Sequence, residues 1–386
     1  MSTSDVSERV EAVRAAAVEI TRRYDRRYWL SCAEKHDFTT AQWEALAESG
    51  LLGLSLPEAV GGAGGGLTEM VALMETLAEA GTANDFIVIV GLCQIPILKH
   101  GTPEQVDRFV KPSVTGEKKI CFAITEPDAG TNTFKIRTRA RRTEQGWVLS
   151  GQKVFITGAD ECEYMMVVAR TQAAPDVADR RDGLSLFVIE TASAGLTMQE
   201  MDIVIGWPER HYTVFYDDVE VPADSLLGEE HQAIRYLFDA LNPERLLVAA
   251  KAVGLGAFAL NKAVAYAKER APFDQPIGSY QAVQHPLARA KTHLDAARLM
   301  MYRAAERFDR GEKVGPESNM AKLLASEACS EAVDALVKVH GGSSFDRDYD
   351  VASLLPVSRL MEVAPINNDM VLNYIGEHVL GLPKSY

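Results

Sequence analysis

Apolar residues recur every three to four positions along the first part of the chain, which is the period of an amphipathic helix. The pattern begins in Ser7–Trp29, where apolar residues such as Val13 and Ala17 are separated by charged ones. Further runs with the same period follow at Ala41–Ser49, Thr68–Ala80, Asp85–Lys99 and Thr102–Thr115. Residues 1–118 are therefore predicted to form an N-terminal all-helical domain.

After residue 118 the pattern changes to short segments rich in β-branched and aromatic residues, which is typical of strands. Turn-forming residues separate them, as at Glu144–Gly146 and Gly151–Gln152. The segments are Ile120–Thr125, Trp147–Ser150, Lys153–Thr157, Tyr164–Arg170, Leu184–Glu190 and Tyr212–Tyr216. Residues 119–228 are predicted to form an antiparallel β-domain, with the polar stretch Ala173–Gly183 as an exposed loop.

Long helical periodicity returns after residue 228. The runs are His231–Leu241, Pro243–Arg270, Ser279–Arg310, Pro316–Val339 and Asn367–Leu380. Their lengths and short connections predict a helical bundle over residues 229–386. The fold class is α+β, in the order helical domain, β-domain, helical bundle.

Composition narrows the functional classes. The 386 residues are 47% hydrophobic and 24% charged, with a formal net charge of −14. Binding to a phosphate backbone requires a basic face, so we expect no nucleic-acid partner. The most apolar stretch, Phe86–Leu98, is shorter than the roughly 20 residues that span a bilayer, so we expect no membrane partner.

The cysteines and the N-terminal residues suggest a compartment. Five scattered cysteines without CxxC spacing are typical of reduced thiols in a cytoplasmic protein. Residues 1–14 mix acidic and basic groups and lack an apolar core, so we expect no signal peptide. The eight histidines show no ligand spacing, and we expect no metal.

Two glycine patterns resemble nucleotide-binding loops. Gly61–Gly66 lacks the lysine of a phosphate loop and does not follow a strand, which favours an ordinary loop. Gly254–Ala259 matches GxGxxA but lies within a helical run, where small residues let two helices approach closely. His340, beside Gly341 and Gly342, is interpreted as a packed or capping residue.

Glu244 is the most informative ionisable residue. The segment Asn242–Arg245 is typical of the start of a helix. Asn242 would be the N-cap, Pro243 would occupy the first helical position, and an acid follows in the first turn. An acid in the first helical turn is favoured by the helix dipole, which would give Glu244 a structural role.

Four ordered motifs add a resemblance. Cys121–Asn132 (CFAITEPDAGTN) resembles the TEPxAGS signature of the flavin-dependent acyl-CoA dehydrogenases, and Gly151–Gly158 resembles their GxKxWITN strand. Arg270–Ile277 is similar to their RxxFGxPI segment, and His340–Gly342 to their double-glycine turn. The match covers essentially the whole chain in the family's order.

The resemblance implies an N-terminal helical domain, a middle antiparallel β-barrel and a C-terminal four-helix bundle. It implies a non-covalent FAD, and a homotetramer built as a dimer of dimers. Members of the family dehydrogenate acyl-CoA, or an acyl group on a carrier protein, in lipid metabolism. Their electrons pass to an electron-transferring flavoprotein or a similar acceptor.

The resemblance also implies which residues contact FAD. Those expected at the flavin ring or its diphosphate are Phe122, Ile124, Thr125, Thr131, Phe155 and Thr157. Those expected at the cofactor of a neighbouring subunit are Arg270, Phe273 and Gln281. Further cofactor-binding positions by resemblance are Lys338, Gly341, Gly342, Asn367 and Asp369.

The chemistry of the family requires a base that removes an α-proton while a β-hydride passes to flavin N5. The family's usual glutamate would fall at Pro365, which cannot act as a base. Isovaleryl-CoA dehydrogenases instead carry the glutamate in a Glu–Arg pair on a bundle helix, and Glu244–Arg245 matches that position. The resemblance therefore implies Glu244 as catalytic base, supported by Arg245, with Glu362 and Asp369 as the other carboxylates to consider.

Other positions depart from the family pattern. Pro365 has no N–H for the thioester carbonyl, so either the chain is shifted locally or the cofactor's ribityl hydroxyl holds the oxygen. Asp274 replaces a glycine, and Lys338 stands where a glutamine is common. Asn367 and Asp369 also replace the usual side chains beside the flavin. A divergent branch of the family would explain these differences.

The resulting prediction is FAD-dependent α,β-dehydrogenation of an acyl-CoA. Two alternatives stay open. One is a flavin oxidase or monooxygenase of the same fold, in which reduced flavin meets oxygen. The other is a relative that binds FAD and a partner without dehydrogenase activity.

Overall fold

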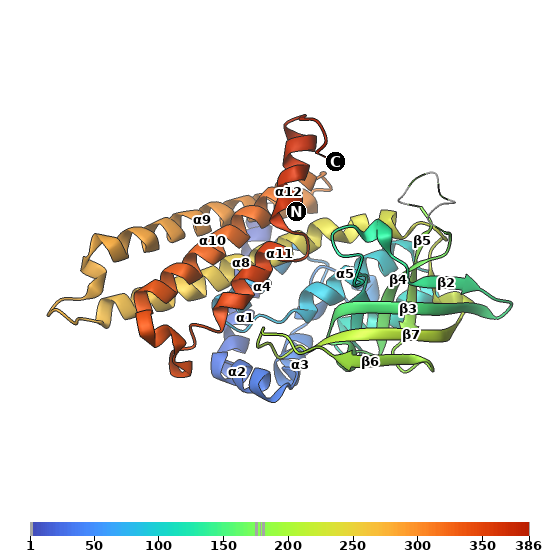
Figure 1. Ribbon diagram of the computed structural model, residues 1–386, viewed down its shortest axis with the longest axis horizontal. Helices are drawn as coiled ribbons and strands as arrows, with labels where there is room; N and C mark the ends of the chain where they lie inside the picture. Colours follow the sequence, from blue (N-terminus) through green and yellow to red (C-terminus); the bar gives the residue numbers. More distant parts are fainter. Residues whose placement is uncertain (1–2, 174–176, 178, 180–181, 386) are drawn as a thin grey trace.

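Helices occupy both ends of the chain, and strands lie between them. The computed structural model describes residues 3–173, 177, 179 and 182–385. In Figure 1 the β-domain lies at one end of the longest axis, and the C-terminal helices extend toward the other. The predicted loop Ala173–Gly183 lies largely outside the described residues.

The N-terminal part is helical, as predicted. Its helices are α1 (Thr3–Arg23), α2 (Arg26–Lys35), α3 (Thr40–Glu48), α4 (Leu67–Glu79), α5 (Phe86–His100), α6 (Pro103–Gln105) and α7 (Lys111–Val114). The single helix expected over Ser7–Trp29 is in fact two. Asp25 breaks it, because its carboxylate accepts hydrogen bonds from the N–H groups of Arg27 and Tyr28 and caps α2.

The middle part is one sheet. Its strands are β1 (Ile120–Ala123), β2 (Arg139–Arg142), β3 (Gly146–Thr157), β4 (Tyr164–Arg170), β5 (Leu184–Glu190), β6 (Leu196–Glu200), β7 (His211–Pro222) and β8 (Leu226–Leu227). Their order is β6-β7-β3-β2-β4-β5-β8, and β1 pairs with β4. Neighbours are antiparallel except β2–β4 and β1–β4, so the purely antiparallel expectation is corrected at these two pairs.

The expected turn at Gly151–Gln152 is wrong, because β3 continues through it. The pairing of β3 with β7 shifts between Leu149 and Gly151, which marks a bulge. Gly151 has φ +145°, and a Cβ there would lie 2.7 Å from the Cα of Thr138. This glycine therefore permits close strand packing within one long strand.

The C-terminal part consists of α8 (Ala233–Glu269), α9 (Gln281–Asp309), α10 (Gly315–His340), α11 (Leu354–Val363) and α12 (Asn368–Tyr374). The predicted helix start at Asn242 is wrong, because Pro243 lies inside α8. The helix packs against α4, α5, α9 and α10, and this packing outweighs the hydrogen bond that a proline removes. Glu244 is therefore a mid-helix residue, and the first-turn explanation for it no longer applies.

Among the described helices, α8 alone is long and apolar enough to cross a membrane. In its most apolar window, 67% of the residues are buried inside the protein. A buried core helix passes the same test of length and composition.

The two glycine patterns have structural explanations, as predicted. Residues 61–66 form a loop that leads into α4, where the N–H groups of Leu67 and Thr68 donate to the Asp309 carboxylate at 2.7 and 2.9 Å. These donors are therefore already occupied. In α8, a Cβ on Gly254 would lie 2.4 Å from the carbonyl oxygen of Glu75, so α4 and α8 pack in close contact. His340 is buried and stacks on Tyr266, with a centroid separation of 4.1 Å.

Gly254→Ala is expected to destabilise the protein by roughly 1–3 kcal/mol, because the added methyl group meets the backbone of α4. Gly256→Ala is the matched control. Its Cβ would meet a methyl group of Leu294 at 2.5 Å and the Cα of Cys329 only at 3.2 Å, which is a milder clash than the 2.4 Å approach at Gly254. Thermal and urea unfolding measure both variants, and equal stability of the two would contradict this account of α4–α8 packing.

Candidate active site

Two of the flavin motifs meet at the ends of β1 and β3. The N–H of Val154 donates to the carbonyl of Thr125 at 2.9 Å, and Lys153 Nζ donates to the carbonyl of Ile124 at 2.9 Å. Phe122, on β1, is half-buried, as are Ile124 and Thr125. The structure thus brings together the segments that the resemblance places at the flavin ring.

A buried ion pair fixes this arrangement. Lys153 is fully buried, and its Nζ donates to Glu126 Oε1 at 2.9 Å. Burial lowers the pKa of Lys153 to about 8. Burial alone would raise the pKa of Glu126, but Lys153 and hydrogen bonds from Thr138 and Arg137 outweigh it and lower that pKa. The loop after β1 is therefore tied to the end of β3 by a charged contact that excludes water.

Phe155 and Thr157 project from the end of β3. Phe155 has φ +60°, an unusual conformation for an aromatic residue, and its side chain is 58% exposed. Thr157 is half-buried, and its Oγ1 lies 3.2 Å from His211 Nε2. A strained, exposed aromatic beside a hydroxyl is suited to covering a flat, polar-edged ligand.

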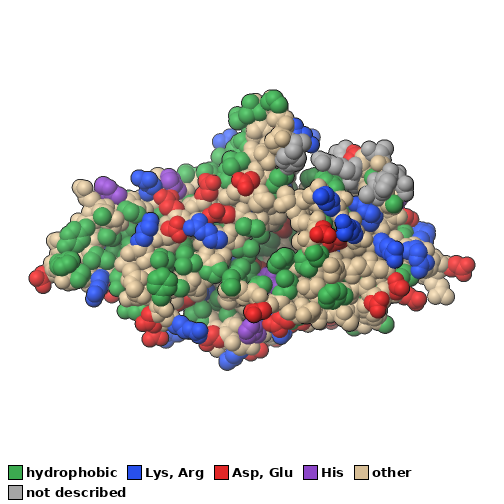
Figure 2. All heavy atoms as spheres, viewed as in Figure 1, with side chains coloured by type: hydrophobic (Ala, Val, Ile, Leu, Met, Phe, Trp, Pro, Cys, Tyr) green, Lys and Arg blue, Asp and Glu red, His purple; other side chains and the backbone are tan. Residues whose placement is uncertain are grey.

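The C-terminal segment reaches the same region. Asn367 Nδ2 donates to Thr131 Oγ1 at 3.1 Å, although the two residues are 236 positions apart. The exposed Asp369 lies two residues further on. In Figure 2 the surface is hollowed between the projecting α12 and the β-domain.

Lys322, which the sequence analysis did not select, holds this segment. Its Nζ donates to the carbonyl oxygens of Glu362 and Ile366 at 3.2 and 2.6 Å and to Asn368 Oδ1 at 2.8 Å. Lys322 is fully buried, and burial lowers its pKa to about 8. The segment that contains Pro365 is therefore anchored to α10 at both ends. A lysine within a helical run carries no sequence signal for partners 40 to 46 residues away.

The donor set fits FAD. The hydroxyls of Thr125, Thr131 and Thr157 can donate hydrogen bonds to carbonyl or phosphate oxygens, and Phe155 offers an apolar face for a ring. Gly130 is exposed, and a Cβ there would meet no atom within 4 Å. Thr125 lies beside β3 through its contact with Val154, and Thr131 follows six residues later in the same loop.

Glu244 lies on α8 beside a small apolar cavity of about 30 Å³. Its carboxylate makes no hydrogen bond or ion pair with any residue that the structure describes, and its side chain is half-buried. Burial raises the pKa of Glu244 to about 7, and the adjacent Arg245 acts in the opposite direction. A carboxyl group with this pKa can accept a proton near neutral pH.

Arg245 is held beside Glu244. Its Nη1 donates to Asn242 Oδ1 at 3.0 Å, and Asn242 Oδ1 also accepts from Ser318. Its buried Nε has no partner, nor has the buried Oδ1 of Asn319. Burial lowers the pKa of Arg245, with Glu244 and Tyr374 opposing the shift.

The other two carboxylates differ from Glu244. Glu362 accepts hydrogen bonds from Ser330 and, at 3.0 Å, from Arg359. Asp369 is exposed in the first turn of α12. Of the three carboxyl groups, Glu244 is therefore the one that lies beside an apolar cavity and has no hydrogen-bond or ion-pair partner among the described residues.

The remaining predicted cofactor residues lie at the other end of the bundle. Arg270 follows the last turn of α8, and the stacking of His340 on Tyr266 places Gly341 and Gly342 beside the same turns. Those exposed are Arg270, Phe273, Gln281, Lys338, Gly341 and Gly342. In Figure 1 the α8–α9 connection is at the far end from the β-domain, so one chain does not bring these residues to Thr131 or Phe155.

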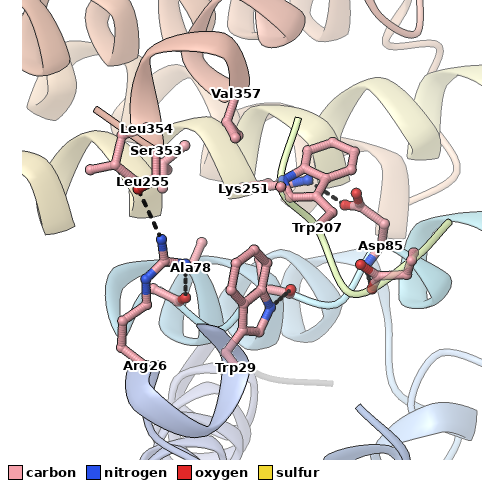
Figure 3. Close-up of a pocket in the computed structure, with 14 residues that line it drawn as sticks. Arg26, Trp29, Ala78, Asp85, Trp207, Lys251, Leu255, Ser353, Leu354 and Val357 are labelled. Carbon is pink, nitrogen blue, oxygen red and sulfur yellow. Dashed lines mark hydrogen bonds and ion pairs between the residues drawn. The ribbon is translucent and has the colours of Figure 1, made fainter. Parts of the chain in front are cut away.

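A buried charged cluster behind Thr157 was also not predicted. Lys251 on α8 pairs with Asp85, and its Nζ lies 3.9 Å from the centroid of the Trp207 ring. Figure 3 shows Lys251, Trp207 and Asp85 pointing toward one another. The Asp85 N–H donates to Glu209 Oε1 at 3.1 Å. Burial, with Asp85 nearby, raises the pKa of Glu209 to about 8, while Lys251 acts to lower it.

Comparisons with known proteins identify the class. Three family models match, described as the N-terminal, middle and C-terminal domains of acyl-CoA dehydrogenase, at residues 7–117, 121–219 and 234–380. The chain is 41% identical over 383 residues to acyl-CoA dehydrogenase FadE12 of Mycobacterium tuberculosis, covering 98% of each chain. It is 32% identical over 333 residues to CarC of Acetobacterium woodii, a subunit of a caffeyl-CoA reductase–Etf complex, covering 86% of this chain and 87% of CarC.

Solved structures agree. Butyryl-CoA dehydrogenase from Megasphaera elsdenii aligns with a TM-score of 0.91 and 27% identity, covering 98% of this chain and 99% of that chain. An FAD complex of PigA aligns with a TM-score of 0.89 and 25% identity, covering 99% and 98%. The chain is an oxidoreductase of the flavoprotein class, and it belongs to the acyl-CoA dehydrogenase family.

Glu209→Gln is expected to raise the melting temperature most at alkaline pH. The pKa of Glu209 is about 8 in the folded protein and about 4.5 in the unfolded chain. The contribution of the protonated carboxyl to stability is therefore fully present below about pH 4.5 and is lost as the pH rises through about 8. Thermal unfolding from pH 5 to 9 measures the difference from wild type. The exposed Glu220→Gln, on the same strand as His211, is the control. A difference that does not grow with pH would contradict the shifted pKa.

Proposed function

We propose that this chain catalyses FAD-dependent α,β-dehydrogenation of an acyl-CoA, with Glu244 as the base that removes the α-proton. The observation that carries the proposal is the unpaired Glu244 carboxyl beside an apolar cavity, with a pKa near 7. The α-carbon of a thioester is a weak acid, so a base works best when its pKa lies near the working pH.

The chain's own residues bind, orient and shield the reactants. When bound, FAD supplies the hydride acceptor. Thr125, Thr157 and Phe155 would hold the ring, and Thr131 would donate to the diphosphate region. Arg245 favours the charged form of Glu244, which prepares the carboxylate to receive the proton.

Pro365 limits how the carbonyl oxygen of the substrate can be bound. Proline has no N–H, so the oxygen on which charge develops depends on donors outside this position. Lys322 holds the segment on both sides of Pro365, which supports a defined path for the chain here.

The proposal includes an assembly and a partner. The exposed Arg270, Phe273 and Gln281 would contact the cofactor of a neighbouring subunit, in a homotetramer built as a dimer of dimers. The likeness to CarC, a subunit of an Etf complex, supports an electron-transferring flavoprotein as acceptor. A cytoplasmic location completes the proposal.

Glu244→Gln is expected to slow flavin reduction roughly 10²–10⁴-fold, because the amide cannot accept the α-proton. Anaerobic mixing of the FAD-loaded protein with butyryl-, isovaleryl-, octanoyl- and palmitoyl-CoA, followed by flavin absorbance, measures this rate. The substitution keeps the side-chain shape, so FAD and acyl-CoA binding are expected to persist.

Glu362→Gln is the matched control and is expected to retain the wild-type rate. Bleaching that survives in Glu244→Gln and disappears in Glu362→Gln would assign the base to Glu362. Rapid reoxidation of reduced flavin by air would favour an oxidase or monooxygenase. An FAD-bound protein that no thioester bleaches would favour the non-dehydrogenase alternative.

The rate of flavin reduction, as kcat/KM, is expected to rise with pH through about 7. The base acts when deprotonated, and the pKa of Glu244 lies near that value. A pH series in buffers of constant ionic strength measures the profile. A flat profile between pH 5.5 and 8.5 would contradict the raised pKa.

A further inference from the structure

Gly91 is a helix-interior glycine without a packing reason. It lies in the middle of α5, where glycine costs roughly 1 kcal/mol relative to alanine. A Cβ on Gly91 would meet no heavy atom within 4 Å, whereas one on Gly254 would meet the backbone of α4 at 2.4 Å. Its φ is also not in the left-handed region that favours glycine. Neither packing nor backbone conformation therefore requires a glycine at this position.

The open space at Gly91 belongs to the cavity that Glu244 lines. Ile87, Gly91 and Ile95 are spaced four residues apart and share one face of α5. This face and Pro243, Glu244 and Leu247 of α8 line the same cavity. A group that occupies this cavity therefore shares it with both Glu244 and the open space at Gly91.

We propose that Gly91 determines substrate specificity by leaving room, next to Glu244, for the acyl chain of a short, apolar acyl-CoA. The inference rests on the proposed function, because it takes Glu244 as the base. It adds the class of acyl group and the residue that selects it.

The cavity walls limit the chain to a few carbons. Its walls include core residues such as Trp43, Leu67 and Met70, which are at most 5% exposed. The volume of about 30 Å³ corresponds to space for about two or three water molecules. A longer chain would have to displace these residues from a close-packed core.

The cavity also favours an apolar chain. Apart from Glu244, its polar lining residues are Ser55 and Gln94. Ser55 is exposed, and Gln94 is buried with its amide donating to Ser113 at 2.9 Å. The other lining residues are apolar, so a polar group on the acyl chain would lose its hydration and find few partners on these walls.

The test uses the FAD-loaded protein with Gly91→Ala and Gly91→Leu. Steady-state kinetics with butyryl-CoA and octanoyl-CoA give kcat/KM. Equilibrium binding of the same two thioesters is measured in the Glu244→Gln background, where turnover does not interfere. Thermal unfolding accompanies each variant, and Gly254→Ala is the control glycine.

We expect wild type to prefer butyryl-CoA. Gly91→Ala should weaken butyryl-CoA binding roughly 10-fold or more, the effect of about one methylene in an apolar pocket, while its melting temperature stays equal or rises. Gly91→Leu should abolish binding of both chains. Gly254→Ala should lower the melting temperature and leave the chain preference unchanged.

Unchanged affinity in Gly91→Ala and Gly91→Leu would overturn the role of Gly91 while leaving Glu244 as base intact. A wild-type preference for octanoyl-CoA would overturn the short-chain assignment. If Gly91→Leu does not fold, the alanine variant alone decides. Absence of flavin bleaching by any thioester would overturn the proposed function, and this inference with it.

Discussion

The packing of α8 along its full length is the constraint on which the candidate site depends. Its 37 residues lie against α4, α5, α9 and α10 without a break at Pro243. Glu244 and Lys251 are seven residues apart, or roughly 10 Å along the helix axis. One rigid element therefore presents a carboxyl group to the apolar cavity and an ammonium group to the charged cluster behind Thr157. Further along the same helix, Gly254 lets α8 pack in close contact with α4.

Three buried lysines hold the chain segments around the candidate site. Lys153 holds the loop after β1, Lys322 holds the segment around Pro365, and Lys251 holds Asp85, which directly precedes α5. A buried ammonium is costly unless each of its protons has an acceptor. Lys322 has three oxygen acceptors and Lys153 has two, whereas Lys251 has the Asp85 carboxylate and the face of the Trp207 ring. The three lysines thereby tie the loop after β1, the segment around Pro365 and the start of α5 to other parts of the fold.

Local sequence patterns predict much of this architecture but not its long-range contacts. The α, β, α order and the nearness of Thr125 to the end of β3 follow from periodicity and motifs. The rules for proline at helix starts and glycine in turns fail at Pro243 and Gly151, because packing against neighbouring elements outweighs local preference. The Lys251 cluster depends on residues up to 166 positions apart, which no local pattern connects. The open space at Gly91 likewise becomes visible only when the facing helices are in place.

The cap on α4 also links the N-terminal helices to the C-terminal bundle. Asp309, the last residue of α9, accepts the N–H groups of Leu67 and Thr68, and it occupies the space where Gly66 would carry a side chain. The N-terminus of α4 is thus capped by a residue that lies 242 positions from Leu67 in the sequence. The N-terminal helices and the bundle are consequently joined by this cap as well as by the α4–α8 packing, and separating them would leave two backbone N–H groups of α4 without their acceptor.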